Sequence, residues 1–193
     1  MEPTASGGGS RAIPLYGPDI RKGERMNFAG QWAEGEVRSL EECWRRIWAA
    51  IDSLGIEGMK RPTTAGWTAK EMFAHLAFWE ETAVPVIKSM LRGGPEVPLH
   101  EWYGGDDLVD LSPGQDWSHT THIHNAREAR WARAHSPEEI LDRLRKAQHS
   151  SVQVISTITD EEGKGVIGKY WSGAARCAHF EEHLGELGEG AEV

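Results

Sequence analysis

The stretch GWTAKEMFAHLAFWEETAVPVIKSML, residues 66–91, decides the fold class of this chain. Thr68 is a favourable N-cap and Glu71 follows three residues later, which is the capping-box pattern of a helix start. Pro85 predicts a kink or an end of the regular helix, and Gly93-Gly94-Pro95 closes the segment. Apolar residues recur at the three- and four-residue spacing of a helix face: Met72, Phe73, Leu76, Trp79, Ala83, Val84, Ile87 and Leu91.

Four further segments show helical rather than strand periodicity. The first, from about 31 to 54, carries a strong apolar stripe and stops at the glycines of 55–58. A shorter helix is expected at about 120–134, another from 137 to about 159 behind a Ser136 cap, and the last at about 172–187. No segment has the alternation of a β-strand. The sequence therefore predicts an all-α bundle of four main helices and one short helix.

Two segments lack helical periodicity. Residues 1–25 are rich in Gly, Ser, Pro and charge, so we expect a disordered N-terminal extension ahead of a single helical domain at 26–193. Met26 is a candidate natural start. Residues 93–118 form a long loop between the second and third helices, which favours either an active-site lid or a surface excursion with aromatic anchors.

The composition excludes some classes of function. A formal net charge of −9 argues against a non-specific nucleic-acid binder, which needs a basic face. No apolar run reaches the roughly 20 residues that span a bilayer, and no signal peptide is recognisable, so a cytoplasmic protein is expected. Cys43 and Cys177 form no CxxC pair, and we interpret them as small apolar fillers of helices.

Three histidines form the candidate metal site. His179 and His183 lie four residues apart on one helix, so both rings can reach one ion. His75 lies between Met72 and Trp79 at the edge of the apolar stripe, where a buried ring needs a partner. A divalent metal would serve all three rings, although a single inward histidine is more often hydrogen-bonded to a neighbour.

The other histidines are weaker candidates. Each is expected to be exposed, although three of them, beside the long loop, offer a fourth ligand: His119, His122 and His124. Residues 179–183 also fit the inverted zincin pattern HxxEH. Only ten residues follow His183, which is too short a chain to return a carboxylate ligand, so a metalloprotease is not expected.

Residues 66–80 resemble the first signature of the DinB-like (DinB/YfiT-like) metal-binding bundles, in which Trp-Ser/Thr precedes a His, a Leu and an aromatic-acidic pair. Residues 179–183 resemble the second signature, often His-Tyr-x-x-His. Asn125 together with residues 136–141 resembles the ClbS/DfsB-type subgroup, related to colibactin self-resistance cyclopropane hydrolases. The resemblance covers about residues 31–187, and the chain departs from it in its N-terminal extension and in the 93–118 loop.

The resemblance implies an up-down-down-up four-helix bundle, often a homodimer, with zinc or nickel on His75, His179 and His183. Characterised relatives include hydrolases and transferases or isomerases that use a low-molecular-weight thiol. A metal on three protein ligands keeps an open position, which suits hydrolysis or thiol transfer on a small electrophilic molecule. A non-catalytic bundle that sequesters a small toxic compound is the alternative.

Further residues are candidates for orienting the ligating rings or for lining a substrate pocket. Glu182 and Glu80 are weak candidates for orienting a ligating ring from outside the coordination shell, and each is also a typical solvated acid of a helix surface. Four tryptophans are candidate pocket walls: Trp79, Trp102, Trp117 and Trp171.

Overall fold

The computed structural model describes residues 26–94 and 117–188, and it describes side chains from residue 122 onward in the second range. The predicted N-terminal extension and most of the predicted 93–118 loop lie outside these ranges. The described residues are mostly helical, and their β structure is limited to an isolated bridge between Pro62 and Thr68. The all-α fold class is confirmed.

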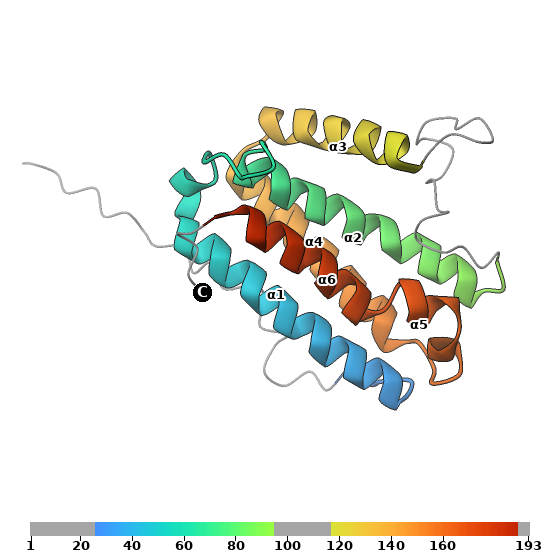
Figure 1. Ribbon diagram of the computed structural model, residues 1–193. Helices are drawn as coiled ribbons and strands as arrows, with labels where there is room; N and C mark the ends of the chain where they lie inside the picture. The colour runs from blue at the N-terminus through green and yellow to red at the C-terminus, as the bar shows by residue number, and fades with distance from the viewer. Residues whose placement is uncertain (1–25, 95–116, 189–193) are drawn as a thin grey trace, which may run out of the picture.

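The described helices pack against one another in one bundle (Figure 1). α2 packs against α3 and α4, and α1 packs against α4 and α6, so α2 and α6 belong to one helical body. None of the described helices is long and apolar enough to cross a membrane. The bounds are α1 Gln31–Gly58, α2 Ala69–Leu91, α3 Trp117–Ala134, α4 Pro137–Ser156, the 3-10 helix η2 Glu162–Lys164, α5 Val166–Tyr170 and α6 Gly173–Glu186.

The start of α2 follows the prediction from its sequence. The Thr68 side chain accepts a hydrogen bond from the Glu71 backbone N–H, and the Glu71 carboxylate accepts one from the Thr68 backbone N–H. The helix runs through Pro85 to Leu91, so the proline does not end it. Pro85 is exposed, and water can therefore reach the Glu81 carbonyl that lost its helical donor.

The other helix ends differ from the sequence-based bounds by a few residues. Gly55, the expected stop of α1, has a φ of +60°, which breaks the regular helix, and helical structure resumes to Gly58. α4 ends at Ser156, and the connection to α6 contains η2 and α5, which the sequence pattern did not predict. These short helices are built from Gly- and Lys-containing segments that carry no clear apolar period.

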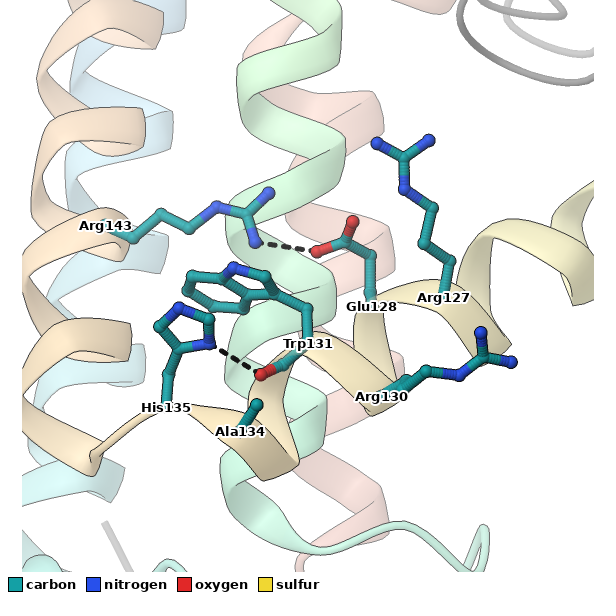
Figure 2. Close-up of a pocket in the computed structure, with 7 residues that line it drawn as sticks. All are labelled: Arg127, Glu128, Arg130, Trp131, Ala134, His135 and Arg143. Carbon is teal, nitrogen blue, oxygen red and sulfur yellow. Dashed lines mark hydrogen bonds and ion pairs between the residues drawn. The ribbon is translucent and has the colours of Figure 1, made fainter.

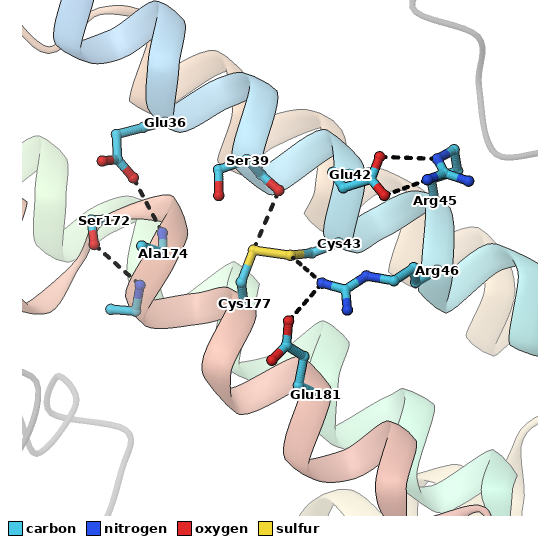
Figure 3. Close-up of a disulfide and its surroundings, with 11 residues drawn as sticks. Glu36, Ser39, Glu42, Cys43, Arg45, Arg46, Ser172, Ala174, Cys177 and Glu181 are labelled. Carbon is cyan, nitrogen blue, oxygen red and sulfur yellow. Dashed lines mark hydrogen bonds and ion pairs between the residues drawn. A yellow bond between two sulfur atoms is a disulfide. The ribbon is translucent and has the colours of Figure 1, made fainter. Parts of the chain in front are cut away.

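The interpretation of the cysteines as separate apolar fillers is wrong. Cys43 and Cys177 are buried, but they form a disulfide bond with a Cα–Cα distance of 5.7 Å (Figure 3). The bond joins α1 to α6 across 134 residues of sequence. Such a separation carries no spacing signal, because only the packing of α1 on α6 brings the two thiols together. Beside the bond, Arg46 contacts Cys43 Sγ and pairs with Glu181.

A cluster centred on Arg143 holds α3 against the other helices. From α4, Arg143 pairs with Glu81 of α2 and with Glu128 of α3 at 2.7 and 2.6 Å. Its guanidinium lies 4.4 Å from the ring centre of Trp131, which stacks on His135 (Figure 2). Arg143, Glu128, Trp131 and His135 line a surface pocket, in which the charges of Arg143 and Glu128 are paired with each other. The ion pairs and the cation–π contact of Arg143 therefore hold α3 in position beside α2.

Candidate metal centre

The three predicted histidines converge between α2 and α6. His75 Nε2 lies 3.2 Å from His179 Nε2, and His183 Nε2 lies 3.0 Å from the same atom. The ligand atoms of the three rings all lie within 4.8 Å of one another. Because His179 and His183 are one helical turn apart, α6 presents both rings to the face of α2 that carries His75.

These distances suit a bound ion. Two imidazole nitrogens that each lie about 2.0–2.1 Å from a tetrahedral zinc ion are roughly 3.3 Å apart. The observed separations of 3.0 and 3.2 Å are close to that value. The third separation, between His75 and His183, is within 4.8 Å, so the three rings are close enough to hold one divalent metal.

Two rings of the cluster, His75 and His179, have pKa values well below the ordinary value of a histidine. Burial, followed by the neighbouring rings of His179 and His183, lowers the pKa of His75 to about 2. Burial and the His183 ring lower the pKa of His179 to about 4. Both rings therefore carry a free nitrogen lone pair at neutral pH, which is the state that binds a metal.

His183 receives an orienting carboxylate that the sequence analysis missed. The Nδ1 of His183 lies 3.0 Å from Glu186 Oε2, so Nδ1–H donates to the carboxylate and Nε2 keeps its lone pair. The backbone carbonyl of Glu186 in turn accepts hydrogen bonds from the N–H and the hydroxyl of Thr64. The three-residue spacing of His183 and Glu186 on α6 is the signal that would have indicated this pair.

His75 has a different neighbour at its outer nitrogen. The indole Nε1–H of Trp79, one turn along α2, donates to His75 Nδ1 at 3.2 Å. A neutral His75 ring that accepts at Nδ1 carries its proton on Nε2. In this arrangement Nε2–H of His75 points at the other two rings, whereas Nε2 of His183 presents a lone pair.

Hydrogen bonds alone cannot satisfy the three inner nitrogens. If His179 Nε2 is a lone pair, it accepts from His75 but faces the lone pair of His183. If it carries a proton, it donates to His183 but faces the N–H of His75. One of the two close contacts is therefore unfavourable in either tautomer of His179. A cation among three lone pairs removes the conflict, and on this observation the residues fit a metal better than a purely hydrogen-bonded cluster.

The two predicted orienting carboxylates lie elsewhere. Glu80 is buried and accepts hydrogen bonds from Ser151 of α4 and Arg176 of α6. Glu182 is exposed. Within the described part of the chain, neither carboxylate hydrogen-bonds to a ring of the cluster. Glu80 instead ties α2, α4 and α6 together behind the site.

Of the weaker histidine candidates, one is buried and one is exposed, and neither lies in the cluster. His124 was expected to be exposed, but it is buried on α3, where its ring stacks on Phe78 and meets the edge of Trp79. The packing of α3 on α2 causes this burial. His122 is exposed as expected, and neither residue joins the cluster that can hold a metal. The side chain of His119 lies outside the described residues.

Aromatic side chains surround part of the cluster. Trp67, which the sequence analysis did not assign to the site, meets His75 edge-on with ring centres 4.9 Å apart and lies 6.1 Å from His183. Trp79, a predicted pocket wall, hydrogen-bonds to His75 through its indole nitrogen, and its role as a wall stays a prediction. Trp171 is buried, and the side chains of Trp102 and Trp117 lie outside the described residues.

Asn125 of α3 is the remaining polar neighbour of the cluster. A hydrogen-bonding interaction with its side chain raises the pKa of His75 against the larger lowering effects of burial and of the other rings. The amide oxygen of Asn125 is buried and has no hydrogen-bond partner among the described residues.

Comparison with known families agrees with this arrangement. The model of the DinB superfamily matches residues 39–185, a range that contains all three histidines, and the chain belongs to this superfamily. No curated protein and no solved structure matches the chain significantly.

Proposed function

We propose that this protein is a divalent-metal-dependent enzyme that acts on a small electrophilic molecule by hydrolysis or thiol transfer. The observation that carries the proposal is the convergence of three largely buried imidazole rings, with Nε2–Nε2 distances of 3.0 and 3.2 Å to His179. Within the described residues no fourth side chain joins this cluster. Three protein ligands with a remaining open position are typical of catalytic rather than structural metal sites.

Each residue at the cluster has a proposed role in binding the metal or the substrate. His75, His179 and His183 would hold the ion, and Glu186 orients His183. A divalent ion held there would lower the pKa of a coordinated water or thiol toward neutrality and polarise a bound electrophile. Trp67 supplies an apolar surface beside the ligands, which favours a small, partly apolar substrate.

Zinc and nickel are the proposed metals. All three ligands are imidazoles, which suit both ions, and the absence of thiolate and carboxylate ligands from the cluster disfavours the softest and the hardest metals. Membership of the superfamily supports the same choice.

Finer assignments also belong to this proposal. We place the chain nearest the ClbS/DfsB-type subgroup, with its long helices in the up-down-down-up order. We expect the protein to form a homodimer. Its expected partners are a small-molecule substrate and a low-molecular-weight thiol. No nucleic acid or membrane partner is proposed. A cytoplasmic location stays a prediction, and the disulfide weighs against it, because such bonds persist mainly in oxidising environments.

The experiment compares the wild-type protein, made without a His tag and loaded with zinc or nickel, with His183→Ala. Each is incubated with a panel of epoxides, cyclopropanes and activated esters, with and without an added low-molecular-weight thiol. We expect the wild type to turn over at least one class, and His183→Ala to lose about 100-fold or more of that rate while keeping its helical circular dichroism spectrum.

The outcomes separate the candidate functions. Turnover without thiol supports hydrolysis, and turnover that requires thiol supports transfer. Stoichiometric binding of an electrophile without turnover in any condition would contradict the enzyme proposal and favour the sequestering function. Equal rates for wild type and His183→Ala would show that the three-histidine cluster is not the active site.

A further inference from the structure

The disulfide bond and two of the clustered histidines share helix α6. Cys177 precedes His179 by two residues and His183 by six. The bond ties this part of α6 to Cys43 of α1, a helix that contributes no side chain to the histidine cluster within the described residues. A covalent link therefore lies within one helical turn of the first of these histidines, although it takes no part in binding a metal itself.

The position of α6 beside α2 is set largely through α1. α6 packs against α1, whereas its direct contacts with α2 are fewer. Besides the disulfide, α1 and α6 are joined by a hydrogen bond from the Ala174 N–H to Glu36 and by the ring contact of Trp44 with Phe180. A change at the α1–α6 interface therefore moves both α6 histidines relative to α2.

Metal binding depends on that relative position. The separation of His179 and His183 is set within one helix and stays the same when α6 shifts as a body. The 3.2 Å separation of the His75 and His179 Nε2 atoms joins two helices and changes directly. Because metal–ligand distances tolerate changes of only about 0.2 Å, a small shift of α6 is enough to weaken the bonds to a shared ion.

Each sulfur of the disulfide has a polar neighbour that suits the reduced state (Figure 3). Arg46 Nη2 lies 3.3 Å from Cys43 Sγ, where a cation stabilises a thiolate. Cys177 Sγ lies 3.4 Å from the carbonyl oxygen of Ser39, to which a thiol can donate but a disulfide sulfur cannot. The same surroundings therefore accommodate both the bonded and the reduced pair without leaving a buried polar group unpaired.

The two sulfurs are nearly enclosed between the helices. Cys43 and Cys177 are 4% and 6% exposed, so a reductant reaches them only when α1 and α6 separate locally. The ion pair of Arg46 with Glu181 bridges the same two helices beside the bond and is partly exposed. Cleavage of the disulfide and loosening of the α1–α6 interface are therefore coupled.

We propose that Cys43 and Cys177 form a reversible redox pair that controls the metal affinity of the histidine cluster. The disulfide holds α6 where its two histidines meet His75, and reduction lets α6 shift and weakens the binding of the metal. The inference rests on the metal-binding function proposed above.

The reductant is a low-molecular-weight thiol. Its thiolate attacks Cys177 Sγ, and Cys43 leaves as a thiolate beside Arg46. A second thiolate attacks the small-thiol sulfur of this mixed disulfide and releases Cys177. The protein thereby gains two electrons and two protons and ends with two thiols, while two small thiols are oxidised to their own disulfide. Oxidation of the pair is the reverse exchange.

The first test compares zinc affinities by competition with a chelator of known affinity. The proteins are the oxidised wild type, the wild type reduced with a phosphine, and the double variant Cys43→Ala and Cys177→Ala. We expect the reduced wild type and the double variant to bind zinc about 10-fold more weakly than the oxidised wild type. The double variant has no thiol that could bind zinc, and its affinity with and without phosphine controls for binding of zinc by the reductant.

Equal or tighter zinc binding by the reduced wild type would overturn the proposal, and so would a double variant that binds zinc as tightly as the oxidised wild type. Circular dichroism of each protein checks that the helices are retained. If the double variant does not fold, the oxidised and reduced wild type still decide the matter.

The second test uses the reciprocity of coupled equilibria. If reduction weakens zinc binding, then zinc must oppose reduction by the same factor. The ratio of reduced to oxidised protein is measured in buffers of glutathione and its disulfide, with and without saturating zinc. We expect zinc to lower this ratio about 10-fold in the wild type and to leave it unchanged in His75→Gln, which lacks one of the clustered rings. No shift in the wild type, or an equal shift in His75→Gln, would contradict the coupling.

The results distinguish this inference from the proposed function. If the wild type takes up neither zinc nor nickel in either redox state, the metal site itself is wrong. If it binds zinc with the same affinity in both states, the site stands and only its control by the cysteine pair is wrong.

Discussion

At the scale of single residues, Glu186 decides which nitrogen of His183 faces the other rings. Removing its carboxylate in Glu186→Ala leaves His183 free to turn or to change tautomer, and we expect zinc affinity to fall by about 10- to 100-fold. Affinity is measured by competition with a chelator. Glu182→Ala removes the same charge from an exposed position on the same helix, and we expect it to change affinity by less than about threefold. A larger loss at Glu182 than at Glu186 would contradict this assignment.

The lowered pKa values of His75 and His179 predict how stability depends on pH. Below pH ~6.5 the unfolded chain takes up protons on these rings, while the folded chain does not until about pH 4 for His179 and about pH 2 for His75. The free energy of unfolding of metal-free protein should therefore fall as the pH drops from ~6.5 toward 4, and these groups should contribute no slope above pH ~7.5.

Urea unfolding at pH 7.5 and pH 5 measures this effect. The double variant His75→Gln and His179→Gln lacks both rings, so its stability should change less between the two pH values than that of the wild type. Equal changes in the two proteins would show that these rings titrate alike in the folded and unfolded states.

The convergence of the three histidines was easier to predict from the sequence than the side chains around them. The four-residue spacing of His179 and His183 and the stripe position of His75 are local signals, and the structure brings these three residues together. Glu186 lies outside the signature residues 179–183 and was not predicted, although it follows His183 by three residues and so lies on the same face of the helix. The burial of His124 against Phe78 and Trp79 depends on how α3 packs on α2, which no spacing within one helix reports.

At the scale of helices and their connections, the disulfide between α1 and α6 fixes the helix that carries two of the three clustered histidines. Breaking it should lower the free energy of unfolding by about 2–4 kcal/mol, because the bond closes a loop of more than a hundred residues in the unfolded chain. Urea unfolding with and without a reductant measures the change. The double variant Cys43→Ala and Cys177→Ala should lose the dependence on reductant.

Two results would contradict the disulfide. Native protein with two reactive thiols would show that the bond does not form in solution. Equal unfolding midpoints of the wild type with and without reductant would show that the bond, if formed, does not stabilise the fold.

The helices themselves were well predicted where capping and periodicity coincide. Thr68 with Glu71 and Ser136 with Glu139 both form the expected capping boxes. Pro85 did not end α2, because an exposed proline in a helix that is buried on its other side is tolerated when packing holds both halves. η2 and α5 were missed because helices of three and five residues are too short for an apolar period to be recognised.

At the scale of the whole molecule, one hydrophobic core joins the helices around the histidine cluster. Trp44 of α1 and Phe180 of α6 pack at its centre with ring centres 4.7 Å apart, and Phe180 directly follows His179. The packing of the core therefore sets the position of the ligands. The expected homodimer is a prediction at this scale, and light scattering that shows a monomer at working concentration would contradict it.

The central claim is that His75, His179 and His183 together hold one divalent metal. Anomalous diffraction from crystals of untagged protein grown with zinc or nickel tests it most directly, at the absorption edge of the metal. The account predicts one strong anomalous peak per chain, about 2.0–2.1 Å from the Nε2 atoms of all three rings. A metal bound elsewhere, or no peak at this cluster in metal-soaked crystals, would contradict it.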